Sequence, residues 1–142
     1  MDLSRVFPRS PKQKMAGLVH LCRMIDKGRA YKEKKLADYI YPCSLDKIIL
    51  NFLGIKADTF ANITVEKKDK GISNWAKELI KSKSPNELAL INKIILENKP
   101  DSEDRLKYYN KTRDKIDPSR SDLTTWVDLM DLEEGRFPQK VS

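Results

Sequence analysis

Apolar residues recur along much of the chain at the three- and four-residue spacing that marks one face of a helix. The pattern predicts a first helix from about residue 11 to residue 30, begun by Ser10 as N-cap and by Pro11 in the first turn. A second helix is expected over residues 45–53, ended by Gly54. Further helices are expected over three more ranges, namely residues 72–80, 85–97 and 102–116.

Three segments are less regular. Residues 37–43 alternate weakly and contain Pro42, which predicts at most a minor short strand there, and residues 58–63 are expected to form a short helical turn. The last apolar segment fits a helix or a strand, but Trp126 and Leu129 at helical spacing, with Asp122 as N-cap, favour a helix. We therefore expect an all-α fold, a single compact domain of five or six short helices over residues 1–136, followed by a frayed tail over residues 137–142.

The composition agrees with a soluble globular domain. The chain has 142 residues, of which 39% are hydrophobic and 35% are charged, and a chain of this size can bury one core without disulfides. No apolar run is long enough to cross a bilayer and the N-terminal residues lack the apolar centre of a secretory signal, so a cytoplasmic protein with no membrane contact is expected. The two cysteines, Cys22 and Cys43, are then expected to be structural thiols.

The positive charge is concentrated near the N-terminus. The formal net charge is +7, and residues 1–35 hold ten Lys and Arg against three Asp and Glu, whereas the rest of the chain holds eighteen of each. Such a surface can attract an anionic small molecule, an acidic protein partner or nucleic acid. Nucleic acid is the least favoured partner, because most of the cations are Lys and residues 8–30 contain no aromatic side chain on which a base could stack.

Arg29 stands out on the helical wheel of the first helix. One side of this wheel is apolar and holds Met15, Leu18, Leu21, Cys22 and Ile25. His20, Arg23 and Lys27 fall on the opposite, polar side, but Arg29 lies in line with the apolar stripe. Either the helix frays and the guanidinium reaches water, or Arg29 is internal, where it ties two segments together or binds a carboxylate or phosphate. The candidate partners within the chain are Asp26 and five acidic residues near the C-terminus, Asp122, Asp128, Asp131, Glu133 and Glu134.

Four phrases of the sequence resemble DUF5069, a bacterial domain family of unknown function. They are DLSRVFPRSP, GLVHLCRMIDKGRA, YIYPCSLDKIILNFLGI and RSDLTTWVDLMDLEEGR, and they recur in the same order over nearly the whole chain. The resemblance implies an identity and a size, but no activity, substrate or cofactor. The chain departs from the family pattern at Gly28, where Ala is expected, and at Ser44, where Pro is expected.

Familiar catalytic and metal-binding patterns find little support. The chain has one histidine, His20, which excludes a His-rich metal site within one subunit, so no metal and no cofactor are expected. Cys22 lies two positions from His20 and cannot face it on a helix, whereas a pair of Cys43 with His20 remains open because Cys43 precedes a helix N-terminus. Three acidic residues at three-residue spacing, Asp128, Asp131 and Glu134, most simply face solvent.

Three functions remain open, and whether the chain is an enzyme is left undecided. The favoured hypothesis is a polar pocket for an anionic small molecule, in which Arg23, Arg29 and Lys47 hold the anion while His20 or Asp26 handles protons. The alternatives are an adaptor that binds an acidic protein through the basic first helix, and weak nucleic-acid binding by the same surface. The candidate site residues are His20, Arg23, Asp26, Arg29, Cys43, Asp46, Lys47, Asp122, Trp126 and Asp128.

Overall fold

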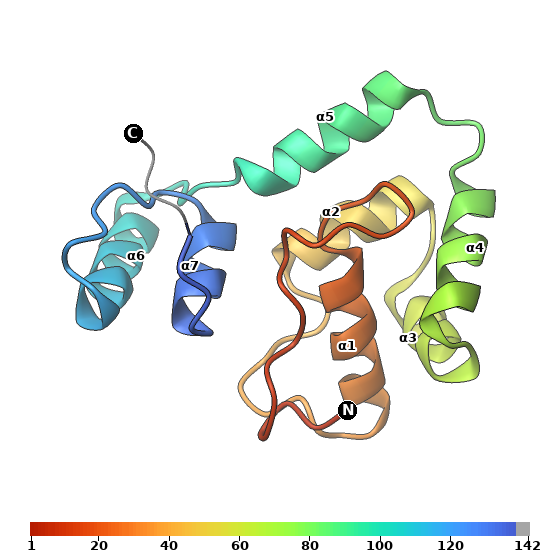
Figure 1. Cartoon of the computed structure of the whole chain (residues 1–142), viewed down its shortest axis with the longest axis horizontal. Coiled ribbons are helices and arrows are strands. Elements are labelled where there is room, and N and C mark those ends of the chain that lie inside the picture. Colours follow the sequence, from red (N-terminus) through yellow and green to blue (C-terminus); the bar gives the residue numbers. More distant parts are fainter. Residues whose placement is uncertain (139–142) are drawn as a thin grey trace. The chain divides into compact units, whose positions relative to one another are not determined.

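The computed structural model describes residues 1–138, in which it has seven helices and no named strand, so the expected all-α class is confirmed. The helices are α1 (Leu21–Lys32), α2 (Ser44–Leu53), α3 (Ala57–Glu66), α4 (Asp69–Leu79), α5 (Pro85–Leu96), α6 (Glu103–Ile116) and α7 (Trp126–Glu133) (Figure 1). The count exceeds the expected five or six because residues 57–66, expected to hold only a short turn, form the complete helix α3.

Contacts between residues divide the chain into two compact units. Unit 1 covers Met1–Ile95 and therefore holds α1 to α4 and nearly all of α5, while unit 2 begins at Leu96 and holds α6 and α7. The expected single domain over residues 1–136 depends on how the two units associate, and it stays a prediction. Of the expected frayed tail, residues 139–142 lie outside the described residues.

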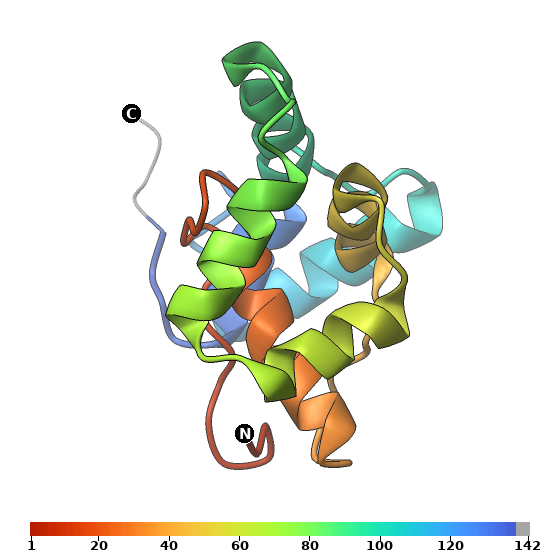
Figure 2. The same ribbon diagram turned by 90° about the vertical axis from the view of Figure 1, so that its right-hand side faces the viewer.

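Helix α1 is the central helix of unit 1. Every residue from Leu21 to Gly28 is buried, so α1 has no exposed face over its first two turns. In Figure 1 the N-terminal segment, α2 and α3 surround it, and in Figure 2 α3 and α4 lie in front of it. The amphipathic wheel expected for this helix is therefore wrong, because partners cover the polar side as well as the apolar side.

The first helix begins about ten residues later than expected. Residues 15–20 instead form a turn in which Met15 and Leu18 exchange backbone hydrogen bonds of 3.0 and 2.9 Å. The side-chain amide of Asn92 on α5 completes this turn, since it accepts a bond from the Val19 N–H and donates one to the Gly17 carbonyl, each at 2.9 Å. A distant side chain thus satisfies backbone groups that a longer helix would have paired locally.

Two further segments differ from the expectation. Residues 37–43 contain no strand, and the N-cap of α7 is Thr125, which replaces the expected Asp122.

Within the described residues no single helix is long and apolar enough to cross a membrane, and α2 with α3 reach that length and composition only as a pair bent by 82°.

Gly28 explains how closely α1 and α3 approach each other. A Cβ atom at this position would lie 3.0 Å from Cγ2 and 3.1 Å from Oγ1 of Thr64 on α3. Thr64 is itself buried, and its hydroxyl donates a hydrogen bond to the Ala61 carbonyl, so it has little freedom to move aside. Glycine at position 28, where the family pattern has alanine, therefore leaves the space that the Thr64 side chain occupies.

We expect Gly28→Ala to destabilise the protein by roughly 1–2 kcal/mol, because the overpacking penalty exceeds the gain in helix propensity. In a Thr64→Ala background the same substitution should stabilise by up to about 1 kcal/mol, since the clash is gone. Denaturant unfolding of the four proteins measures this cycle. Gly71→Ala on α4, where the new Cβ lies 3.4 Å from Lys67 Cβ, is the matched control. Equal effects of Gly28→Ala in both backgrounds would contradict the assignment to Thr64.

Candidate functional site

A cluster of four side chains, three buried and one partly buried, joins the start of α1 to the start of α2. The Asp46 carboxylate on α2 lies at its centre and has no exposed surface. Its Oδ1 is 2.7 Å from His20 Nε2, and its Oδ2 accepts bonds from Lys27 Nζ at 2.6 Å and from the Cys43 backbone N–H at 2.9 Å. Lys27 Nζ also contacts Cys43 Sγ at 3.3 Å. We call these four residues the Asp46 cluster.

Two helix starts position the Asp46 cluster. His20 is the N-cap residue of α1 and Lys27 lies seven residues later, which places both on the same helix face. On α2, Cys43 is the N-cap residue and Asp46 the third helical residue, and the two form a reciprocal capping box. The arrangement places a carboxylate at the helix N-terminus, where the helix dipole stabilises negative charge.

The electrostatics of the Asp46 cluster follow from burial and from the charges that lie next to each group. Burial raises the pKa of Asp46, but the bonds from His20 and Lys27 outweigh it and hold the pKa well below the ordinary 3.8. For His20, burial together with the positive charges of Lys27 and Arg23 outweighs Asp46 and lowers the pKa below 6.5. Burial, with help from the charge of Asp46, raises the pKa of the Cys43 thiol. At neutral pH Asp46 is therefore a carboxylate, the imidazole of His20 is neutral and Cys43 is a thiol.

The tautomer of His20 follows from its partner. A carboxylate accepts hydrogen bonds and donates none, so the neutral imidazole carries its proton on Nε2 and donates it to Asp46. Nδ1 is then a bare acceptor, and within the described residues it is the buried side-chain nitrogen or oxygen with no hydrogen-bond partner. An imidazole held by a carboxylate at one nitrogen and bare at the other is the arrangement of a general base.

Three energetic costs meet at His20. Its ring is completely buried, its Nδ1 is unsatisfied, and its backbone is left-handed with φ of 71°. An unsatisfied buried acceptor costs about 1–3 kcal/mol, and a left-handed non-glycine residue costs a similar amount. Costs of this kind are retained at functional sites more often than elsewhere.

The Asp46 cluster also contains donor atoms that zinc prefers. One ligand atom each from His20, Cys43 and Asp46 lie within 4.8 Å of one another, and nitrogen, sulfur and carboxylate oxygen are all zinc ligands. The Lys27 ammonium, however, already contacts both Cys43 Sγ and Asp46 Oδ2, so a metal bound there would have to displace a buried cation. The expectation of no metal stays a prediction.

A second polar network lies along the same helix and involves Asp26 and Arg29. Asp26 receives three hydrogen bonds from Arg9, from its backbone N–H at 2.8 Å and from its guanidinium at 3.0 Å each. Asp69 at the start of α4 pairs with both Arg9 at 2.8 Å and Arg29 at 3.0 Å. Arg29 also donates to the carbonyls of Thr64 and Lys67. This network ties the N-terminal segment, α1, α3 and α4 together.

The partner that α1 itself offers Arg29 is wrong, because Asp26 binds Arg9 and Arg29 pairs with Asp69. The expected partners near the C-terminus belong to unit 2 and stay a prediction. Of the roles left open for Arg29, the structure shows the one in which an arginine ties segments together. The reason is its place in the last turn of α1, where the guanidinium reaches the end of α3 and the start of α4.

The structure brings three of the predicted site residues together, His20, Cys43 and Asp46. Arg23 is buried next to them, where it donates to the Arg9 carbonyl and lies over the ring of Tyr39. Lys47 is exposed, and its role with Arg23 and Arg29 in holding one anion stays a prediction.

The remaining predicted residues belong to unit 2. Asp122 pairs with Arg120 through two bonds of 3.0 and 3.1 Å. Trp126 is half-buried and packs edge-on against Tyr109, with ring centroids 5.3 Å apart. The backbone N–H of Asp128 donates to the Thr125 hydroxyl and so caps α7. Within unit 2 these contacts pair the loop residues Asp122 and Arg120, pack Trp126 against α6 and cap α7.

The profile of the DUF5069 family, described as a domain of unknown function, matches residues 5–136. The chain belongs to the DUF5069 family. No curated protein matches it. The DUF5069 region includes both polar networks, from Arg9 to Asp69, and the description assigns neither of them an activity.

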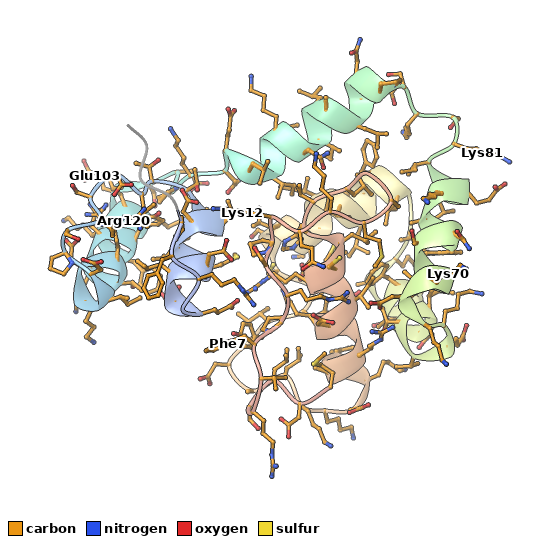
Figure 3. The ribbon with its side chains drawn as sticks, in the orientation of Figure 1. Phe7, Lys12, Lys70, Lys81, Glu103 and Arg120 are labelled. Carbon is orange, nitrogen blue, oxygen red and sulfur yellow. The ribbon has the colours of Figure 1, made fainter. Side chains whose placement is uncertain are left out.

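Sequence reasoning left three important residues of this DUF5069 chain out of the candidate site, Lys27, Arg9 and Asp69. The helical wheel places Lys27 on a solvent face, because it assumes that one side of a helix meets water. Its burial becomes visible only with α2 in place, since the side chain that neutralises it lies nineteen residues away. Figure 3 gives the contrast: Lys81, after the end of α4, extends away from unit 1.

Because His20 is the only histidine, nitrogen NMR of the imidazole reports on this residue alone. At pH 7 we expect a neutral ring with the proton on Nε2, titrating below 6.5. Lys27→Met should raise the pKa of His20, because a positive charge next to the ring is removed. A ring that titrates above 6.5 in the unsubstituted protein, or one protonated on Nδ1, would contradict this account.

The same shifts set the pH dependence of stability. As the pH falls below 6.5 the unfolded chain takes up a proton on His20 before the folded chain does, so stability present above 6.5 is lost. A second loss follows below 3.8, where the unfolded state protonates Asp46 first. In His20→Gln the first loss should disappear and the second should remain.

Asp46→Asn should destabilise the protein by about 3–5 kcal/mol, because it leaves the buried Lys27 ammonium without a carboxylate. The double variant Lys27→Met with Asp46→Leu should recover most of that loss, since no unpaired charge stays buried. Chemical unfolding measures both, with Lys47→Met on the exposed part of α2 as the control, expected to change stability by less than about 0.5 kcal/mol. Equal stability of Asp46→Asn and the control would show that the ion pair contributes nothing.

Proposed function

We propose that this chain binds a small oxyanion that also carries a hydroxyl or acidic proton, and that His20 Nδ1 accepts that proton or hydrogen bond. The bare, buried Nδ1 is the observation that carries the proposal, because it is an acceptor for which the described residues supply no donor. A ligand O–H group would remove the cost of leaving it unsatisfied.

The charges around His20 favour an anion. Lys27 and Arg23 both act on the ring as positive charges, and Asp46 acts on it as a negative charge. A bound oxyanion would interact favourably with the two positive charges. Such a ligand also matches the excess of basic residues in the first 35 positions.

Proton transfer is the chemistry that this arrangement supports. Asp46 fixes the orientation and tautomer of the imidazole and would stabilise the imidazolium that forms when Nδ1 receives a proton. The lowered pKa of His20 makes it a weak base until an anionic ligand adds negative charge nearby. Ligand binding would therefore raise the pKa of the ring, and so couple binding to proton uptake.

Access to the ring requires movement. His20 has no exposed surface, so a ligand reaches Nδ1 only when the segments around it open. The turn at residues 15–20 is closed by two backbone bonds between Met15 and Leu18 and by Asn92. We propose this turn as the segment that opens.

The adaptor alternative has less support, because Arg23 and Lys27 of the basic helix are buried. A bacterial source and a cytoplasmic location stay predictions.

Pairs of anions that differ in one hydroxyl group test the proposal. Phosphate, malate and citrate each carry an O–H group at pH 7, whereas sulfate, succinate and tricarballylate are their counterparts without it. We expect at least one member of the first group to move the His20 nitrogen resonances and raise the melting temperature, with an affinity about tenfold above its counterpart.

Two variants distinguish binding at His20 from a general attraction of anions to a positively charged protein. Arg23→Gln should weaken this binding, whereas Lys47→Gln removes an exposed cation from α2 and should leave it unchanged. The pKa of His20 should rise when the anion is bound. Equal binding of both members of every pair, or shifts that Lys47→Gln abolishes and Arg23→Gln does not, would overturn the proposal.

A further inference from the structure

The geometry points to an oxidative crosslink between Lys27 and Cys43, in which hydrogen peroxide oxidises Cys43 Sγ and Lys27 Nζ captures the oxidised sulfur as a sulfenamide. This modification site goes beyond the proposed function, and its test needs no ligand. The nitrogen and the sulfur are already in contact at 3.3 Å, inside the Asp46 cluster. The formation of an S–N bond needs a further approach of these two atoms and no rearrangement of the fold.

The chemistry balances in two steps. In the first, the thiol reacts with peroxide to give a sulfenic acid and water, so that the sulfur is oxidised and the peroxide reduced. In the second, the Lys27 amine attacks this sulfur, the S–N bond forms, the S–O bond breaks, and the hydroxyl leaves as water with a proton from the nitrogen. A thiol, an amine and one peroxide thus give one sulfenamide and two waters.

Asp46 makes the second step feasible. Lys27 must become a neutral amine before it can attack, and Asp46 Oδ2, at 2.6 Å from Nζ, is placed to accept the proton that the ammonium loses. The reactant buries an ammonium and a carboxylate, while the product buries a neutral sulfenamide and a neutral carboxylic acid. The reaction leaves no unpaired charge in the interior. It also removes two buried charges, the ammonium and the carboxylate, whose desolvation costs free energy in the folded state.

The two thiols of the chain differ in the features that this reaction needs. Cys43 is only partly buried, whereas Cys22 is almost fully enclosed, so Cys43 is the more accessible of the two residues to a small oxidant. Among the interactions described for Cys22 there is no lysine amine, and Arg9, Asp26 and Asp69 surround it instead. The raised pKa of Cys43 makes the first step slow compared with that of sensor cysteines, and we expect millimolar peroxide to be required.

Peptide mapping of the peroxide-treated folded protein tests the crosslink. The intact mass should fall by about 2 Da, the mass of two hydrogen atoms, and reducing agent should restore it. Trypsin cannot cleave after a modified Lys27, so residues 24–29 should appear joined to residues 36–47. Oxidation should also move the His20 resonances, because the Lys27 ammonium is lost from the neighbourhood of the ring.

Two variants distinguish the crosslink from a disulfide and from oxidised Cys43 that is not crosslinked. Cys22→Ser removes the second thiol and should still give the joined peptides, which excludes a disulfide of the same mass. Lys27→Arg keeps the positive charge but has no amine nucleophile, and it should give oxidised Cys43 without the joined peptides. The inference is overturned if Cys22→Ser yields sulfinic acid at Cys43 with no joined peptides, or if the crosslink forms at another lysine.

Discussion

A carboxylate without access to water determines the arrangement of unit 1. Asp46 must receive hydrogen bonds from the protein itself, and it receives them from the end of a turn, from α1 and from the chain entering α2. The farthest of these donors, His20, lies 26 residues from Asp46 in the sequence, so the convergence of the donors fixes the position of one helix start against the other. Removal of any one donor would leave the others facing an uncompensated charge, which is why the cluster behaves as a unit.

The polar residues of α1 fall into two networks with different consequences. Toward the middle of the helix, Asp26 is saturated by Arg9, and Arg29 uses its guanidinium on Asp69 and on two carbonyls. Every charged group in that network has a partner, as a network that only stabilises a fold requires. In the Asp46 cluster, by contrast, one buried nitrogen is left without a partner. The difference assigns stability to the first network and leaves the Asp46 cluster as the place to look for chemistry.

The sequence predicted what is decided locally and missed what is decided at a distance. Gly54 ends α2 as expected, and Ser84 and Ser102 cap α5 and α6, whose ranges were expected, because a cap needs only neighbouring backbone groups. The start of α1 was wrong because Asn92 stabilises the turn before it, and this residue carries no local sign of that role. His20 and Lys27 were placed on a solvent face for the same reason: the wheel gives the angle of a side chain but not which partner covers it.

The choice of histidine at position 20 is not explained by the fold alone. Asp46 needs a donor there, and an asparagine would supply an N–H while tolerating the left-handed backbone with φ of 71° more easily. An imidazole donates through one nitrogen and leaves the other nitrogen as an unpaired acceptor in the interior. An asparagine amide carries two donors on its nitrogen and its acceptor on its oxygen, so it would not leave a bare nitrogen there. What histidine adds is a second nitrogen whose basicity responds to nearby charge. That property is of use only if something with a proton to give reaches it, and this is the physical reason for interpreting the Asp46 cluster as a binding site as well as a structural tie.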